Sequence, residues 1–220
     1  MSFANYYRKE IMRYGGAEEY VLAKASEKKA LLKRVMKYAK TKRILEAGCG
    51  SSSNSIYLSN NGYEVTAADK DYEIILLAKE ISKSFNKKPF FLVSRIENIK
   101  KQPYSVIFSH GVLEHFSNEG IIRLINKELN LGDYVVFSVP SNFFKPSQSI
   151  NGDERFMSES EWVSILSKTN GAIIEKFSYF YDLDNAKLKA LNFLFKITLG
   201  LLPMKKPYIG FVLKKNVCNT

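Results

Sequence analysis

The sequence predicts an α/β fold, doubly wound, in which helices cover both faces of a mostly parallel sheet. Short apolar runs of the kind found in buried strands alternate with helical segments of about ten to fourteen residues. This alternation is typical of right-handed βαβ units. The chain has 220 residues, 45% of them hydrophobic and 25% charged, and it contains no repeat and no Pro/Gly/Ser-rich linker. We therefore expect a single domain over residues 1–220.

The first half of the chain alternates as this fold requires. Residues 16–40 carry an apolar stripe of helical period among lysines, which predicts a helix. Arg43–Ala47 is a short apolar run that stops at Gly48, which indicates a buried strand and a tight turn. The next elements expected are helices over 52–61 and 71–84 and strands over Tyr63–Ala68 and Pro89–Val93.

The second half of the chain departs from strict alternation near its end. The elements expected are strands over Tyr104–Phe108 and Tyr134–Val139, helices over 119–129 and 158–169, and strands over Ala172–Tyr181 and Tyr208–Lys214. The helix over 158–169 has the pattern of a capping box, Ser158 with Glu161 three positions on. Residues 182–207 separate the last two strands, and this interval is too long for a hairpin turn.

Composition excludes several classes of protein. Two cysteines cannot build a disulfide framework, and neither has a partner at metal-ligand spacing, so we expect a reducing, cytoplasmic location. The N-terminus lacks the apolar core of a signal peptide. No uncharged apolar run reaches the roughly 18 residues that a membrane-spanning helix needs.

The net charge of +11 lies at the two ends of the chain. Residues 1–43 carry a net charge of +8 and residues 185–220 a net charge of +7, whereas residues 44–184 carry −4. Basic ends would suit nucleic acid or an anionic membrane surface. The ends hold no arginine-rich cluster and no RNA-binding signature, so we favour a lysine-rich solvated surface.

Residues 46–50, Glu-Ala-Gly-Cys-Gly, lie at the carboxyl end of the first predicted strand and open a helix. In doubly wound sheets ligands bind at this edge. Gly48 and Gly50 let backbone N–H groups approach a ligand, and the helix N-terminus favours an anionic group. Asp69 ends the second strand, where an acid can accept from both ribose hydroxyls. Ser53 replaces the third glycine of a dinucleotide fingerprint, so we expect a pocket for a nucleoside without a pyrophosphate.

Four segments together resemble a known family. Residues 45–50 resemble the E/D-x-G-x-G signature of class I S-adenosylmethionine-dependent methyltransferases, in particular the methyltransferase type 11 branch similar to ubiquinone and menaquinone biosynthesis enzymes. Residues 67–69, Ala-Ala-Asp, are similar to the second motif of that family. Residues 104–115 look like its fourth strand followed by Leu-Glu-His, and residues 131–140 resemble its glycine-led fifth strand. The resemblance covers about residues 40–180.

The resemblance implies a Rossmann-like sheet of seven strands, the last one antiparallel, with S-adenosylmethionine as the cofactor. It implies that the glycine-rich turn and Glu46 hold the methionine end, that Asp69 binds the ribose, and that residues after the third strand flank the adenine. The cofactor-binding residues so implied are Glu46, Ala47, Gly48, Cys49, Gly50, Asp69, Lys70, Arg95, Ile96, Ser109 and His110. Two positions depart from the family pattern. Ser52 replaces a glycine, and Arg95 stands where an adenine-binding acid is common, although arginine cannot accept a hydrogen bond.

Methyl transfer needs an acceptor atom in line with the sulfonium methyl, and it often needs a base to remove a proton. The chain has two histidines, His110 and His115, both after the fourth strand. We expect His110 to be the proton acceptor in preference to His115, which in the family pattern orders this loop. We expect no metal site, because the two histidines and Glu114 have no evident third ligand.

Two insertions, 141–157 and 182–207, are placed to cover the cleft, and residues 1–40 form an N-terminal helical segment. Residues 1–15, with Tyr6, Tyr7 and Tyr14 among them, are a further candidate cover for the cofactor. Residues 186–204 carry a wide apolar stripe bordered by lysines, which suits a core-covering helix, a lid or dimer face, or peripheral contact with a membrane. We expect a monomer or a homodimer.

These observations predict a methyltransferase that moves a methyl group from S-adenosylmethionine to a small-molecule acceptor, a lipophilic acceptor being one option. An RNA methyltransferase that uses the basic ends and a non-catalytic cofactor-binding scaffold are the alternatives. The acceptor itself is not predicted, because specificity lies in insertions that carry no recognised motif.

Overall fold

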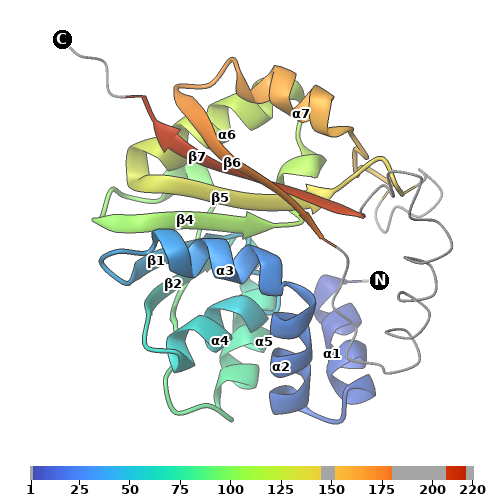
Figure 1. Ribbon diagram of the computed structural model, residues 1–220. Coiled ribbons are helices and arrows are strands. Elements are labelled where there is room, and N and C mark those ends of the chain that lie inside the picture. The colour runs from blue at the N-terminus through green and yellow to red at the C-terminus, as the bar shows by residue number, and fades with distance from the viewer. Residues whose placement is uncertain (1, 145–151, 180–206, 217–220) are drawn as a thin grey trace, which may run out of the picture.

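The computed structural model describes residues 2–144, 152–179 and 207–216, and it has one seven-stranded sheet (Figure 1). The strands are β1 (Arg43–Ala47), β2 (Glu64–Asp69), β3 (Phe90–Val93), β4 (Tyr104–His110), β5 (Gly132–Pro140), β6 (Gly171–Tyr179) and β7 (Tyr208–Lys215). Their order in the sheet is β3-β2-β1-β4-β5-β7-β6. Neighbouring strands are parallel except that β7 is antiparallel to both β5 and β6. The predicted doubly wound α/β fold with an antiparallel last strand is confirmed.

Helices cover both faces of this sheet (Figure 1). They are α1 (Phe3–Arg13), α2 (Ala17–Glu27), α3 (Lys29–Tyr38), α4 (Ser53–Asn60), α5 (Tyr72–Ser82), α6 (Asn118–Leu131) and α7 (Glu159–Leu166). Side chains of successive strand residues point to opposite faces. Ile44 and Val106 pack with α3 and α4 on one face, whereas Leu45 and Ile107 pack with α6 and α7 on the other. Both faces are therefore apolar, as a parallel sheet with two helical layers requires.

The N-terminal segment differs from the prediction. The helix predicted over 16–40 is two helices, α2 and α3, which meet at Lys28, where the backbone (φ −102°, ψ 18°) leaves the helical region. The two helices bury different surfaces, because Tyr20 of α2 joins a core with α1, α4 and α5 whereas Leu31 of α3 packs on the sheet. The prediction of one continuous helix was therefore wrong, and the break places Lys28 at the edge of the sheet.

Local signals elsewhere are confirmed. Ser158 and Glu161 form the predicted capping box: Ser158 Oγ accepts from the Glu161 backbone N–H (N···O 3.3 Å), and the Ser158 N–H donates to Glu161 Oε2 (2.7 Å). The predicted insertion over 182–207, including the amphipathic stretch over 186–204, lies outside the described residues except for its last position, as do residues 145–151 of the first insertion. Among the described helices, none combines the length and the apolar character needed to cross a membrane.

The strand order reverses at β1. From β1 the chain continues to β2 on one side and then to β3 beyond it, and β4 pairs with β1 on the other side. In an open parallel sheet the loops that follow such strands separate, and a crevice opens at their carboxyl ends. The loop after β1 begins at this reversal point.

One buried acid in the fold has no partner. Glu128 of α6 is only 1% exposed, and neither of its carboxylate oxygens has a hydrogen-bond partner in the described structure. Burial raises the pKa of Glu128 to about 8, whereas an exposed glutamate has a pKa of about 4.3. Folding therefore favours the protonated form, and the stability of the fold decreases as the pH rises from the unfolded pKa toward the folded one.

We expect Glu128→Gln, which cannot ionise, to raise the free energy of unfolding at pH 8 by about 3 kcal/mol and to have little effect near pH 4.5. Denaturant unfolding at both pH values measures this difference. Glu18→Gln, at an exposed position of α2, is the control and should leave stability unchanged at both pH values. An equal effect of Glu128→Gln at pH 4.5 and pH 8 would contradict the assignment of a buried, protonated carboxyl.

Candidate functional site

A cavity of about 570 Å³ lies at the carboxyl edge of the sheet, beside the reversal point. Ten of the twelve residues predicted for the site line it: Glu46, Gly48, Cys49, Gly50, Asp69, Lys70, Arg95, Ile96, His110 and His115. Ala47 and Ser109 do not line it. Ala47 belongs to the core under α6 and α7, so the alternation of the strand turns it away from the cavity.

The loop after β1 is tied to the end of β2. The backbone N–H groups of Gly48 and Cys49 both donate to the carbonyl oxygen of Ala68 (2.9 Å each), and the N–H of Gly50 donates to Asp69 Oδ2 (3.1 Å). These hydrogen bonds therefore fix the loop relative to Asp69, the last residue of β2. Asp69 Oδ1 also accepts from the Asp71 N–H (3.0 Å), which fixes the carboxylate at the cavity wall.

Glycine is required in this loop. Gly48 and Gly50 have φ of 69° and 51°, in the left-handed region that side chains disfavour. A Cβ on Gly48 would lie 2.7 Å from Cγ2 of Val112, and a Cβ on Gly50 would lie 2.6 Å from the hydroxyl of Tyr7. Ser52, the departure from the family motif, has a φ of 60° and adopts the left-handed conformation without a glycine. The substitution preserves the turn at the cost of local strain.

Glu46 is buried in the cavity wall, 2% exposed. Its carboxylate accepts hydrogen bonds from Asn54 Nδ2 (2.8 Å) and from the backbone N–H (3.1 Å) and hydroxyl of Ser55, both in the first turn of α4. Burial raises the pKa of Glu46 to about 7, although these hydrogen bonds and the charge of Lys28 oppose the rise. The carboxylate is thus preorganised for a cationic partner.

Lys28 is a cavity residue that the sequence analysis missed. It lines the same cavity as Glu46, and burial lowers the pKa of its ammonium group, with Lys24 lowering it further and Glu46 opposing the change. No sequence signal marks Lys28, because it falls inside a run that was predicted as continuous helix. This part of the cavity wall therefore holds one acid, Glu46, and one base, Lys28, close enough to interact.

The first helix covers the loop. Phe3, Tyr6, Tyr7 and Glu10 of α1 line the cavity, and the hydroxyl of Tyr7 lies against Gly50. These residues fall in the predicted N-terminal cover, residues 1–15, and the structure places them over the site. Tyr20 of α2 lies with its hydroxyl 2.8 Å from Ser51 Oγ, which holds the second helix to the same loop.

His110 ends β4 at the cavity, backed by a chain of hydroxyls. Its Nδ1 lies 2.9 Å from Ser138 Oγ, and Ser138 Oγ lies 2.9 Å from the hydroxyl of Tyr179. Burial holds the pKa of His110 well below its usual range, so the imidazole is neutral at pH 7. Nε2 is the nitrogen left to contact a ligand, since it has no hydrogen-bond partner among the described residues.

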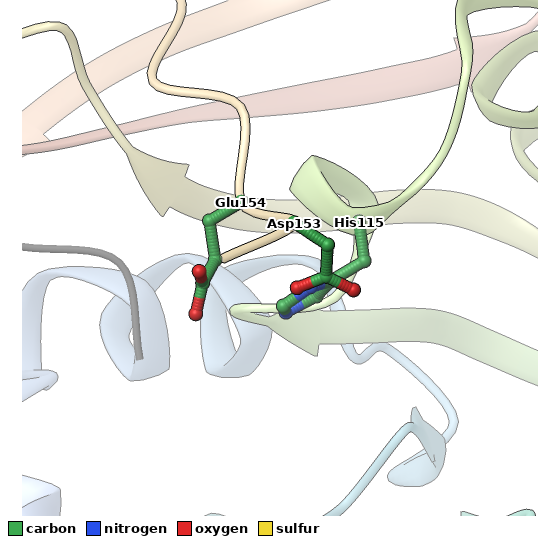
Figure 2. A group of neighbouring side chains, drawn as sticks. All are labelled: His115, Asp153 and Glu154. Carbon is green, nitrogen blue, oxygen red and sulfur yellow. The ribbon is translucent and has the colours of Figure 1, made fainter. Parts of the chain in front are cut away.

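His115 lies in a different environment from His110. Its Nδ1 is 2.9 Å from Oδ1 of Asp153, and Glu154 lies beside them (Figure 2). Glu114, the preceding residue, is 3% exposed, and burial raises the pKa of its carboxyl to about 8, with Glu154 and Asp153 raising it further. The expectation that no third ligand lies near His115 was wrong, because Asp153 and Glu154 come from a segment 38 residues or more along the chain.

Aromatic side chains form another part of the cavity wall. Phe116, Phe144, Phe156 and Tyr208 line it, and the ring of Phe144 contacts those of Phe156 (centroids 5.7 Å apart) and Tyr208 (5.6 Å). The described part of the first insertion thus contributes two rings to the cavity wall, as expected of a cleft cover. The guanidinium of Arg155 instead donates to the carbonyl of Phe116 and to Asn118.

A family model described as tellurite resistance protein TehB matches residues 17–138, which is more than half of the chain. The matched region extends from α2 to β5 and includes the loop after β1, Asp69 and His110. A search of curated protein sequences gives no match.

Solved methyltransferase structures share the fold at low sequence identity. Magnesium protoporphyrin IX methyltransferase ChlM from Synechocystis PCC 6803 with bound SAM has a TM-score of 0.59 and 14% identity, over 90% of this chain and 81% of that one. An S-adenosylmethionine-dependent methyltransferase from Clostridium acetobutylicum has a TM-score of 0.65 and 12% identity, over 87% and 92%. The plantazolicin methyltransferase BpumL, in complex with a triazolic desmethylPZN analog and SAH, has a TM-score of 0.59 and 19% identity, over 90% and 85%. The chain therefore belongs to the TehB family, and it is a class I S-adenosylmethionine-dependent methyltransferase.

Proposed function

We propose that this methyltransferase acts on a small, largely apolar molecule, bound between the cofactor and His110. The observation that carries the proposal is one cavity of about 570 Å³ whose wall joins two chemically different groups of residues. One group is the glycine loop with Glu46 and Asp69, and the other is the four aromatic rings, of which that of Tyr208 lies beside His110 (ring centroids 5.5 Å apart). A cavity of this size, mostly apolar with a few fixed polar groups, is typical of small-molecule sites.

The part of the cavity wall that holds Glu46 and Lys28 fits the zwitterionic methionine part of S-adenosylmethionine. Glu46 would accept from the ammonium group, and Lys28 would pair with the carboxylate, so that each charge of the cofactor meets an opposite charge. Asp69 would accept from the ribose hydroxyls at the tip of β2. Arg95, Ile96 and Glu97 line the wall next to Asp69, where adenine would lie, and Glu97 or the backbone would accept from its amino group.

When bound, the cofactor supplies a methyl group that is already activated by its sulfonium. The residues of the chain then have to orient the acceptor, exclude water and take up a proton. Tyr6 and Tyr7 of α1 cover the loop side, and the aromatic rings enclose the acceptor side. A neutral His110 with its proton on Nδ1, donated to Ser138, would present Nε2 as the proton acceptor.

The charge distribution gives less support to the RNA alternative. Six of the twelve lysines and arginines in residues 1–43 pair with acids: Arg8 with Glu80, Arg13 with Glu10, Lys24 with Glu10 and Glu27, Arg34 and Lys37 with Glu175, and Arg43 with Glu64. Paired side chains are poorly placed to replace counterions on a phosphate backbone. Much of the N-terminal positive charge thus serves contacts within the chain.

We expect Gly48→Ala to weaken binding of S-adenosylhomocysteine at least tenfold, because the new Cβ would displace Val112 and strain the loop. Gly62→Ala is the matched control, since Gly62 also has a positive φ (87°) but has no neighbour within 4 Å of a new Cβ. Calorimetric titration should show wild-type affinity for the control. Absence of any heat with the wild-type protein, or an equal loss in both variants, would contradict the proposed cofactor position.

Cofactor affinity should depend on the ionisation of Glu46. Because burial raises its pKa to about 7, lowering the pH from 8 to 6 protonates the carboxyl and removes the partner of the cofactor ammonium group. We expect affinity for S-adenosylhomocysteine to fall severalfold over this range in the wild type. Glu46→Gln should bind about tenfold more weakly at pH 8 and show a flatter pH response. A steep response that persists in Glu46→Gln would place the titrating group elsewhere.

The role of His110 can be tested by its tautomer. In His115→Gln, which leaves His110 as the only histidine, we expect nitrogen NMR to show a neutral ring at pH 6 with the proton on Nδ1. Ser138→Ala should weaken that preference, since it removes the group 2.9 Å from Nδ1. A proton on Nε2 in the wild-type network would make His110 a donor to the acceptor and would exclude it as the base.

A further inference from the structure

Three metal-ligating side chains converge beside the cavity, and two of them, His115 and Asp153, line it. His115 ends the short 3-10 helix Leu113–His115 after β4, and Asp153 and Glu154 lie in the segment before α7 (Figure 2). One ligand atom from each of the three lies within 4.8 Å of the others. Ligands bonded to one tetrahedral zinc ion lie about 3.3 Å apart, so the pair formed by His115 Nδ1 and Asp153 Oδ1, at 2.9 Å, already has nearly this spacing.

A second observation points independently to a missing cation. Glu114 is 3% exposed, its Oε2 has no hydrogen-bond partner in the described structure, and it lines the same cavity as His115 and Asp153. A buried carboxyl oxygen without a hydrogen-bond partner is costly, and a cation next to Glu114 would supply that partner and favour the ionised form.

Two of the carboxyl groups near His115, those of Glu114 and Asp153, are not paired with a described lysine or arginine. Arg155 is next in the sequence, but its guanidinium donates to the Phe116 carbonyl and to Asn118, which are both uncharged. The cavity lysines are Lys24, Lys28 and Lys70, which lie on α2, at its end and after β2, on the cofactor side. Carboxyl groups that no described lysine or arginine pairs with, those of Glu114 and Asp153, thus lie next to the cavity.

We propose that His115, Asp153 and Glu154 bind one divalent transition-metal ion beside the cavity, with Glu114 next to it. One imidazole and two carboxylates suit Zn²⁺ or Mn²⁺ better than Mg²⁺ or Ca²⁺, which prefer oxygen ligands alone. The side chain of Asp153 is 59% exposed, so it can turn to complete the ligand set without disturbing the core.

The position of the ion indicates a class of acceptor, and this step rests on the proposed function. Three protein ligands leave a coordination position open toward the cavity. An acceptor with a hydroxyl or carboxylate oxygen would occupy that position and be held near His110, which lines the same cavity. Metal binding itself does not depend on the proposed function.

The test uses the full chain without an affinity tag, freed of metal by dialysis against a chelator. We expect Zn²⁺ titrated into this protein to bind at one site per chain with micromolar affinity, and Mg²⁺ to bind at least tenfold more weakly. Co²⁺ in place of Zn²⁺ should give the visible absorption of a site with a nitrogen ligand. Asp153→Asn and His115→Gln should each weaken Zn²⁺ binding at least tenfold.

Asp133→Asn is the matched control, because Asp133 is an exposed aspartate at the opposite end of β5, and it should bind Zn²⁺ like the wild type. No Zn²⁺ binding, or equal binding by Asp153→Asn and Asp133→Asn, would overturn the metal site. Titration of Asp153→Asn with S-adenosylhomocysteine separates the two proposals, since cofactor binding should be unchanged there. If the wild type binds S-adenosylhomocysteine but not Zn²⁺, only the metal site is overturned. If it binds Zn²⁺ but not S-adenosylhomocysteine, only the proposed function is overturned.

Discussion

The site depends on the hydrogen bonds that join the loop after β1 to the end of β2. Gly48 and Cys49 both donate to the carbonyl of Ala68, and Gly50 donates to the carboxylate of Asp69. These contacts need glycine, because a side chain at Gly48 or Gly50 would collide with Val112 or Tyr7. One short loop therefore fixes part of the cavity wall, the position of the Asp69 carboxylate and the start of α4, which in turn holds Glu46.

The wall of the cavity holds its charged groups in separate parts. Glu46 and Lys28 lie together in one part of the cavity wall, where burial raises the pKa of Glu46 and lowers that of Lys28. Glu114 and Asp153 line another part of the cavity wall, and no described lysine or arginine pairs with them. His110 is neutral and is held by Ser138. This distribution suits a zwitterionic cofactor in one part of the cavity and an acceptor held by a cation in the other.

The sequence was sufficient to predict what local patterns determine. The alternation of strands and helices predicted the doubly wound sheet, and the glycines placed after the first strand predicted the site loop. The sequence alone was insufficient to predict contacts that join distant segments of the chain. Lys28 enters the cavity only because two helices bury different surfaces, and Asp153 approaches His115 only through folding of the segment before α7. A motif also does not convey that residues within a strand alternate between faces, which turns the side chains of Ala47 and Ser109 away from the cavity.

The most direct test of this account is a crystal structure of the protein with S-adenosylhomocysteine. The account predicts the ribose hydroxyls within hydrogen-bond distance of Asp69, the amino acid end between Glu46 and Lys28, and the sulfur facing His110 across the aromatic part of the cavity. A ligand bound in the opposite direction, with adenine at Glu46, or bound outside this cavity, would contradict it.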